Sequence, residues 1–152
     1  MVSYMKRDSR LSAVLHALLH MAEHPGPMTS AALGQCLGTN PVVVRRTMGL
    51  LRDAGLVAAG RGHAGGWTIK ADLATVTLRD LHEALGEPAL FAVGHRSENP
   101  ACLVEQVVNA ALNDAFDEAE ALLMERFASV SLAQLAKEFA RRHKAHKRSA
   151  VA

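Results

Sequence analysis

The chain has 152 residues, of which 49% are apolar and 21% charged, a composition typical of one folded domain with an appendage. Aromatic residues make up only 4%, which disfavours a β-sandwich or barrel. No run of about 18 apolar residues is present, and the first ten residues are too polar for a secretory signal, so we expect a cytoplasmic protein. The two cysteines exclude a disulfide framework.

The net charge of +2 is unevenly distributed. Residues 1–70 carry eight Lys or Arg against three Asp or Glu, residues 71–136 carry three against eleven, and residues 137–152 carry six against one. Basic segments around an acidic one indicate a part that binds a polyanion, joined to a part with another role. Solvated faces of an ordinary domain give similar patterns, so charge alone does not identify the function.

Two helices are predicted in the first 38 residues. A cap at Asp8 or Ser9 begins the first, and the breaker at residues 24–27 ends it. Thr29 or Ser30 caps the second, shorter helix.

A third helix begins at Asn40 and Pro41, a favoured cap followed by a residue that fits the first helical position. Apolar residues at spacings of four and three define its inward face: Val44, Met48 and Leu51. The residues expected to point away from the core include Val42, Arg45 and Arg46.

Two short apolar runs, residues 56–58 and 67–69, flank a glycine-rich segment and predict a β-hairpin. Trp67 is expected to pack this hairpin onto the helices. Thr77 to Asp80 matches a capping box and predicts a fourth helix that ends near Gly86.

Asn99 and Pro100 predict the start of a long helix that reaches about residue 127. Such a helix beside a small domain is expected to bury its apolar stripe against another chain. The stripe consists of Leu103, Val107, Ala111, Ala115 and Leu123. Ser131 to Gln134 then caps a last helix that leads into a basic tail.

The predicted fold is mostly α, a winged helix-turn-helix with a long C-terminal dimerisation helix. The DNA-binding domain is expected at residues 1–85 and a linker or sensor loop at 86–101. Dimerisation helices are expected at 102–140 and a basic tail at 141–152.

This order of elements indicates DNA binding, because an exposed helix fits the major groove and reaches base edges. Asn40 and the free N–H groups at the start of the third helix are expected to hold a phosphate, and Arg61 to reach the minor groove or the adjacent backbone. The full set of predicted contacts is Thr29, Ser30, Asn40, Val42, Arg45, Arg46, Arg61, Gly62 and His63. A winged helix that binds another protein is the alternative, whereas no phosphate loop, nucleophile elbow or zinc-protease motif indicates an enzyme.

The sequence resembles the Rrf2 family of bacterial regulators over about residues 8–127. The resemblance rests on the Asn40-Pro41 pair, the run at residues 51–57, Arg61-Gly62 with Gly65-Gly66-Trp67, the run at residues 77–81, and residues 99–102. It implies a homodimer that represses transcription, with the long helix as the dimer seam. Two recognition helices about one turn of DNA apart in such a dimer predict a pseudo-palindromic operator.

Cluster-binding members of that family carry three cysteines in the loop before the long helix, where this chain has only Cys102. Cys36 lies on the second helix and is interpreted as core. We therefore expect no metal and no cofactor, although an iron–sulfur cluster completed by His or carboxylate ligands remains an alternative.

Cys102 is also a candidate redox sensor. If Pro100 begins the long helix, Cys102 lies in its first turn, where the helix dipole favours the thiolate. An oxidant or a small molecule acting at this loop is then the expected signal, and a buried, inert cysteine is the alternative. His16 and His20, one turn apart, are interpreted as a surface pair rather than as metal ligands.

Overall fold

The computed structural model describes residues 9–91 and 101–151. These residues form a mostly helical winged helix-turn-helix, which confirms the predicted fold class. The helices are α1 (Arg10–Glu23), α2 (Ser30–Leu37), α3 (Pro41–Asp53), α4 (Leu78–Ala84), α5 (Leu103–Ala128) and α6 (Leu132–Val151), and the strands are β1 (Val57–Ala59) and β2 (Trp67–Ile69).

The core lies where α1 to α4 meet the small sheet. The inner face of α3 carries Val44, Met48 and Leu51, all fully buried as the spacing predicts. They pack with Leu33 of α2 and Leu81 of α4, which have no exposed surface. Burial of each such side chain contributes roughly 1.5–3 kcal/mol, so this cluster determines the orientation of α3.

Side-chain hydrogen bonds cap α2, α3 and α4 as predicted, whereas Ser9, the N-cap of α1, makes no side-chain capping hydrogen bond. The Thr29 hydroxyl accepts from the Ala32 N–H at 3.1 Å, and Gly38 ends α2 in the left-handed conformation with φ of 63°. Asn40 Oδ1 accepts from the Val42 N–H at 2.8 Å. Thr77 and Asp80 form a reciprocal capping box at the start of α4. Each of these caps satisfies N–H or C=O groups that a helix end leaves without partners.

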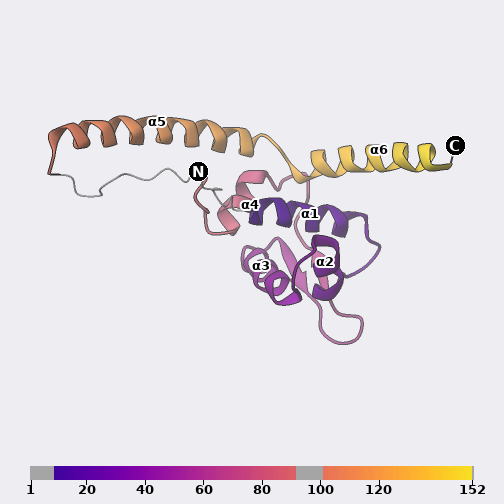
Figure 1. Ribbon diagram of the computed structural model, residues 1–152. Helices are drawn as coiled ribbons and strands as arrows, with labels where there is room; N and C mark the ends of the chain where they lie inside the picture. The colour runs from indigo at the N-terminus through magenta and orange to yellow at the C-terminus, as the bar shows by residue number, and fades with distance from the viewer. Residues whose placement is uncertain (1–8, 92–100, 152) are drawn as a thin grey trace.

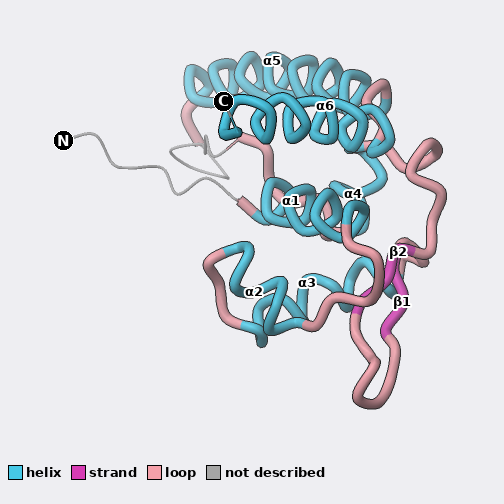
Figure 2. The backbone as a smooth tube through the Cα atoms, turned by 90° about the vertical axis from the view of Figure 1, so that its right-hand side faces the viewer, coloured by secondary structure: helices cyan, strands magenta, loops and turns pink. Residues whose placement is uncertain are grey.

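The wing is the hairpin of β1 and β2, which pair antiparallel with Ala59 opposite Trp67. Met28, just before α2, extends this sheet by an antiparallel bridge to Trp67. Figures 1 and 2 show the hairpin loop projecting on the same side of the molecule as α2 and α3.

The two C-terminal helices run one after the other along the opposite side of the domain, above α1 and α4 in Figure 1. In Figure 2 they again lie on the side away from the wing. None of the helices in residues 9–91 and 101–151 combines the length and apolarity needed to cross a membrane.

The start of α5 differs from the prediction. Asn99 and Pro100 lie outside the described residues, but α5 begins at Leu103, with Cys102 as its N-cap. Cys102 has an extended backbone (φ −81°, ψ 124°), and its carbonyl accepts the first helical hydrogen bond, from the Gln106 N–H at 3.1 Å. The thiol therefore precedes the first turn of α5.

α6 also differs from the prediction. Its first residue, Leu132, is buried in the core of the winged helix, and its N–H donates to the Val76 carbonyl at 2.8 Å. The expected basic tail is helical through Val151, so its cations are carried on α6. Arg141 and Arg142 donate to Glu138, which lowers the pKa of that carboxyl group to about 2. These pairs link neighbouring turns of the exposed helix.

Candidate nucleic-acid interface

An open groove of about 670 Å³ lies between the helix-turn-helix and the wing. One side is formed by Thr29, Ser30 and Ala31 at the start of α2. The floor includes Asn40, Pro41 and Arg45 at the start of α3, and the wing closes the other side. The structure thus brings the starts of α2 and α3 and the base of the wing to one surface, whereas the predicted wing contacts Arg61, Gly62 and His63 are not among the residues that line the groove.

The cations of this surface are available to a polyanion. Arg45, Arg46 and Arg61 are exposed, and within the described residues no carboxylate forms an ion pair with any of them. Val42 is 54% exposed, and Gly62 and His63 are exposed at the tip of the wing. Arg45 lines the groove, whereas Arg46 is not among the residues that line it.

The backbone donors are not distributed as predicted. At the start of α3, Pro41 has no N–H, the Val42 N–H donates to Asn40 Oδ1, and the Val43 N–H donates to the Asn40 carbonyl at 3.0 Å. The expected free N–H groups of α3 are therefore already used, whereas Asn40 retains its side-chain NH₂ and its own main-chain N–H, which has no acceptor within the described residues.

At the start of α2, by contrast, two donors remain. The Thr29 hydroxyl caps Ala32, and no acceptor within the described residues pairs with the N–H groups of Ser30 and Ala31. These groups border the groove, so α2 rather than α3 offers main-chain donors to a phosphate.

Glycines shape the wing. Gly62 has φ of 85°, a left-handed conformation that favours glycine. A Cβ atom on Gly65 would lie 2.7 Å from the Gly60 carbonyl oxygen, which leaves room only for glycine where the two sides of the loop approach. This geometry presents Arg61 at an exposed, narrow tip.

Trp67 anchors the base of the wing. It is buried, as its predicted packing role requires, and its Nε1 donates to the Ser30 hydroxyl at 2.9 Å. The sequence predicts Ser30 as a helix cap or a DNA contact but not as a partner of Trp67, because a hydrogen bond between residues 37 positions apart leaves no local pattern.

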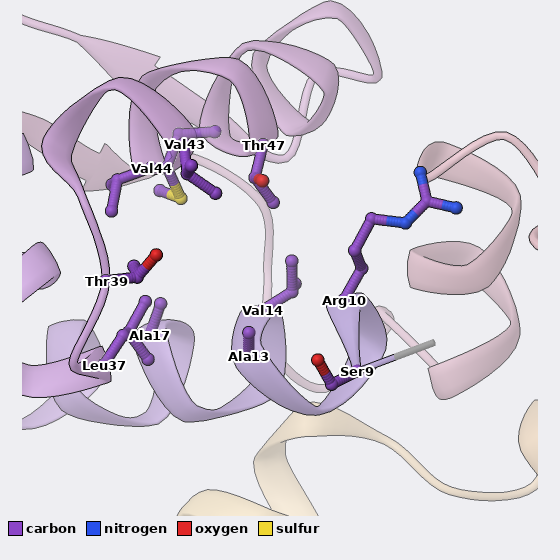
Figure 3. A pocket seen from close by; sticks show the side chains of 11 residues that line it. Ser9, Arg10, Ala13, Val14, Ala17, Leu37, Thr39, Val43, Val44 and Thr47 are labelled. Atoms are coloured by element: carbon purple, nitrogen blue, oxygen red, sulfur yellow. The ribbon is translucent and has the colours of Figure 1, made fainter. Parts of the chain in front are cut away.

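A smaller hollow of about 210 Å³ lies between α1 and α3. Figure 3 shows Ala13, Val14 and Ala17 of α1 on one side of it and Val43 and Val44 of α3 on the other. None of the predicted DNA-contact residues lines this hollow.

The outer face of α5 is apolar and uncovered in the single chain. Leu103 and Val107 are 74% and 70% exposed, and Ala111 and Ala115 are also exposed. Leu123 does not continue this face, because it is half-buried, while its neighbour Leu122 is 69% exposed. Steps of four residues advance about 40° around a helix, so a stripe that starts at Leu103 has turned by about 200° at Leu123.

The two cysteines differ in their surroundings. Cys36 is exposed, so its predicted place in the core is wrong, because α2 turns Leu33 and Gly34 inward and Cys36 toward solvent. Cys102 is exposed as well and makes no capping hydrogen bond. The backbone N–H groups of Glu105 and Val104 nevertheless lower the pKa of its thiol.

His16 and His20 lie as expected on one side of α1, with their Nε2 atoms 3.0 Å apart. Burial and the neighbouring His16 lower the pKa of His20. Within residues 9–91 and 101–151, no group of three His, Cys, Asp or Glu side chains is arranged to hold a metal ion.

Comparison with known proteins identifies the family. The Rrf2 model, described as an iron-dependent transcriptional regulator, matches residues 7–138. The chain belongs to the Rrf2 family. YwnA of Bacillus subtilis (strain 168), named as an HTH-type transcriptional regulator, is 32% identical over 126 residues, which span 82% of this chain and 92% of YwnA. This Rrf2 protein is a DNA-binding transcriptional regulator and not an enzyme, as predicted.

Solved structures share the fold of this Rrf2 protein. A regulator from Lactobacillus plantarum superposes with a TM-score of 0.73 at 21% identity, over 93% of this chain and 98% of the other. T. potens IscR superposes with a TM-score of 0.64 at 18% identity, over 89% of this chain and 88% of the other.

The family description raises the question of iron. The chain has two cysteines, and the structure places them on α2 and at the start of α5. Since the described residues gather no set of three ligands, they do not fit an iron site.

The position of Cys102 predicts its reactivity. In a Cys36→Ser variant, the rate of alkylation by iodoacetamide should rise with pH around a midpoint below the ordinary thiol value of about 8.5, because the thiolate is the reacting form. Rates measured from pH 5 to 10 give this midpoint. A Cys102→Ser variant with Cys36 intact is the control, and a Cys102 midpoint at or above about 8.5 would contradict the prediction.

Proposed function

We propose that this regulator binds a pseudo-palindromic operator as a homodimer and represses transcription in the cytoplasm. The observation that carries the proposal is the convergence of the starts of α2 and α3 and the base of the wing on one groove that Arg45 lines. Arg45, Arg46 and Arg61 are all exposed, and none has a carboxylate partner within the described residues. α3 enters the major groove, and Arg45 and Arg46 approach base edges or phosphates. Arg61 approaches the minor groove or the backbone beside it.

Main-chain donors complete the contact. The N–H groups of Ser30 and Ala31 hold a backbone phosphate at one edge of the groove, and the side-chain NH₂ of Asn40 holds another. Phosphate contacts of this kind position the protein on DNA, whereas contacts from α3 select the sequence. Val42, Gly62 and His63 are exposed, and we propose that they add apolar or backbone contacts to the same duplex.

The dimer forms through the outer face of α5. Leu103, Val104 and Val107 are each 70% or more exposed, which is unusual for a contiguous apolar surface in water. A second copy that pairs through the same face buries these side chains and produces a two-fold axis. Two recognition helices then lie about one turn of DNA apart, roughly 34–36 Å, which corresponds to a pseudo-palindromic site.

Cys102 gives the dimer a site for a signal. It lies at the start of α5, beside the face proposed for dimerisation, and its thiol has a lowered pKa. Oxidation or alkylation of the thiolate changes the charge and size of this N-cap and shifts the α5 helices, which changes the spacing of the recognition helices. A protein-binding winged helix is the competing function, and the arginine variants below separate the two.

Arg45 and Arg61 are predicted to contribute to binding in different ways. With a duplex selected from a random-sequence library, Arg45→Ala should weaken binding by about 1–3 kcal/mol if Arg45 reads a base. Arg61→Ala should weaken binding and, in addition, reduce the dependence of affinity on salt, because one phosphate contact is lost. Fluorescence anisotropy at several salt concentrations measures both effects.

Arg79→Ala is the matched control, because Arg79 pairs with Glu83 on α4, outside the groove. It should bind like the wild type. Equal affinities of all three variants and the wild type for the selected duplex would exclude this groove as the DNA-binding surface.

A charged side chain on the outer face of α5 tests the proposed dimer interface. Val107→Glu should convert the dimer to a monomer in analytical ultracentrifugation, since a buried, unpaired carboxylate would strongly disfavour the interface. Asn113→Asp, an exposed position on another side of α5, should leave the dimer intact. A Val107→Glu variant that sediments as the wild-type dimer would contradict the proposed seam.

A further inference from the structure

The base of the wing is joined to the start of α2 by a side-chain hydrogen bond. Trp67 begins β2 and is only 8% exposed, and its indole Nε1–H donates to Ser30 Oγ at 2.9 Å. Ser30 is the first residue of α2 and lines the groove with Arg45. One hydrogen bond therefore connects the hairpin to the helix-turn-helix at the edge of the DNA-binding surface.

Backbone contacts bring these two residues together. The Trp67 N–H donates to the Met28 carbonyl at 2.8 Å, and the Met28 N–H donates to the Trp67 carbonyl at 3.1 Å. A Cβ atom on Gly66 would lie 2.9 Å from the Met28 carbonyl carbon and oxygen, so this approach requires glycine. β2 is thus held between β1 on one edge and the residue before the α2 cap on the other.

The position of the wing tip depends on this base. Because Arg61 to Ala64 are all exposed, we expect the contacts at the base of the hairpin, those of Trp67 among them, to fix the direction in which the loop leaves the domain. α2 and α3 pack against each other through the core, which fixes Ser30 relative to Arg45. A hairpin fixed to Ser30 is consequently fixed relative to the recognition helix.

We infer that Ser30 and Trp67 are positioning residues, whose hydrogen bond holds the wing at the angle at which Arg61 and Arg45 reach the same DNA duplex. The inference rests on the proposed DNA-binding function. It also gives the Ser30 hydroxyl a second role. Because its oxygen accepts from the indole, its O–H remains as a donor that can point into the groove toward a DNA phosphate.

Coupling between this pair and Arg61 tests the inference. Ser30→Ala and Trp67→Phe are each made alone and together with Arg61→Ala, and affinities for the selected duplex are measured by fluorescence anisotropy. Each single variant should lose roughly two- to tenfold in affinity, as expected for one hydrogen bond. Adding Arg61→Ala should then weaken binding by a much smaller factor than it does in the wild-type background.

Three measurements separate positioning from general damage. Ser30→Thr keeps a hydroxyl, so in this background Arg61→Ala should weaken binding by the same factor as in the wild type. Thr68→Ala, on the exposed face of β2, should likewise leave the effect of Arg61→Ala unchanged. In NMR spectra without DNA, the Trp67 indole N–H should exchange faster with solvent in Ser30→Ala than in the wild type. If Trp67→Phe lowers the melting temperature markedly, Ser30→Ala alone decides the question.

The outcomes separate a failure of this inference from a failure of the proposed DNA-binding function. If Arg61→Ala weakens binding by the same factor in all backgrounds, Ser30 and Trp67 do not position the wing, and only this inference fails. If Arg61→Ala has no effect even in the wild type, the proposed role of the wing in DNA binding fails, and the inference fails with it.

Discussion

Burial of one face of α3 is the constraint on which the rest of the structure depends. Val44, Met48 and Leu51 are removed from water against α1, α2 and α4, and this burial leaves the helix only one orientation. Arg45 and Arg46 occupy the intervening positions and are forced outward. The apolar spacing that stabilises the domain therefore also places two cations on the outer face of α3, which we propose contacts DNA, and no carboxylate within the described residues pairs with them.

The surface around α3 is built from contacts distant in sequence. The wing is attached through Met28 and Ser30 at the start of α2, so the two segments that flank the recognition helix form one connected unit. On the opposite side of the domain, α5 presents an uncovered apolar face, and Figures 1 and 2 show it well away from the wing. This separation means that the proposed dimer contact on α5 would not compete with the proposed DNA contact at the groove.

Local signals in the sequence predicted most of the fold and much of the site. The caps at Thr29, Asn40 and Thr77 depend on residues two or three positions apart, and each is present as predicted. Predictions that depend on tertiary packing are less reliable, because a local sequence pattern does not show which face of a helix meets the core. Cys36 is exposed because burial depends on which face of α2 meets the core. Leu123 is half-buried in the single chain, and its place in the dimer seam stays a prediction.

The local sequence pattern also did not predict which main-chain N–H groups remain free to bind a phosphate. An Asn-Pro start predicts a well-capped helix, but the cap itself uses the donors that a phosphate would need, so α3 offers its side chains and α2 offers its backbone. An NMR titration of ¹⁵N-labelled protein with the selected duplex tests this account most directly. It predicts that the largest shifts occur at Ser30, Ala31, residues 42–46 and residues 61–63. Shifts confined to α5 and α6 would contradict it.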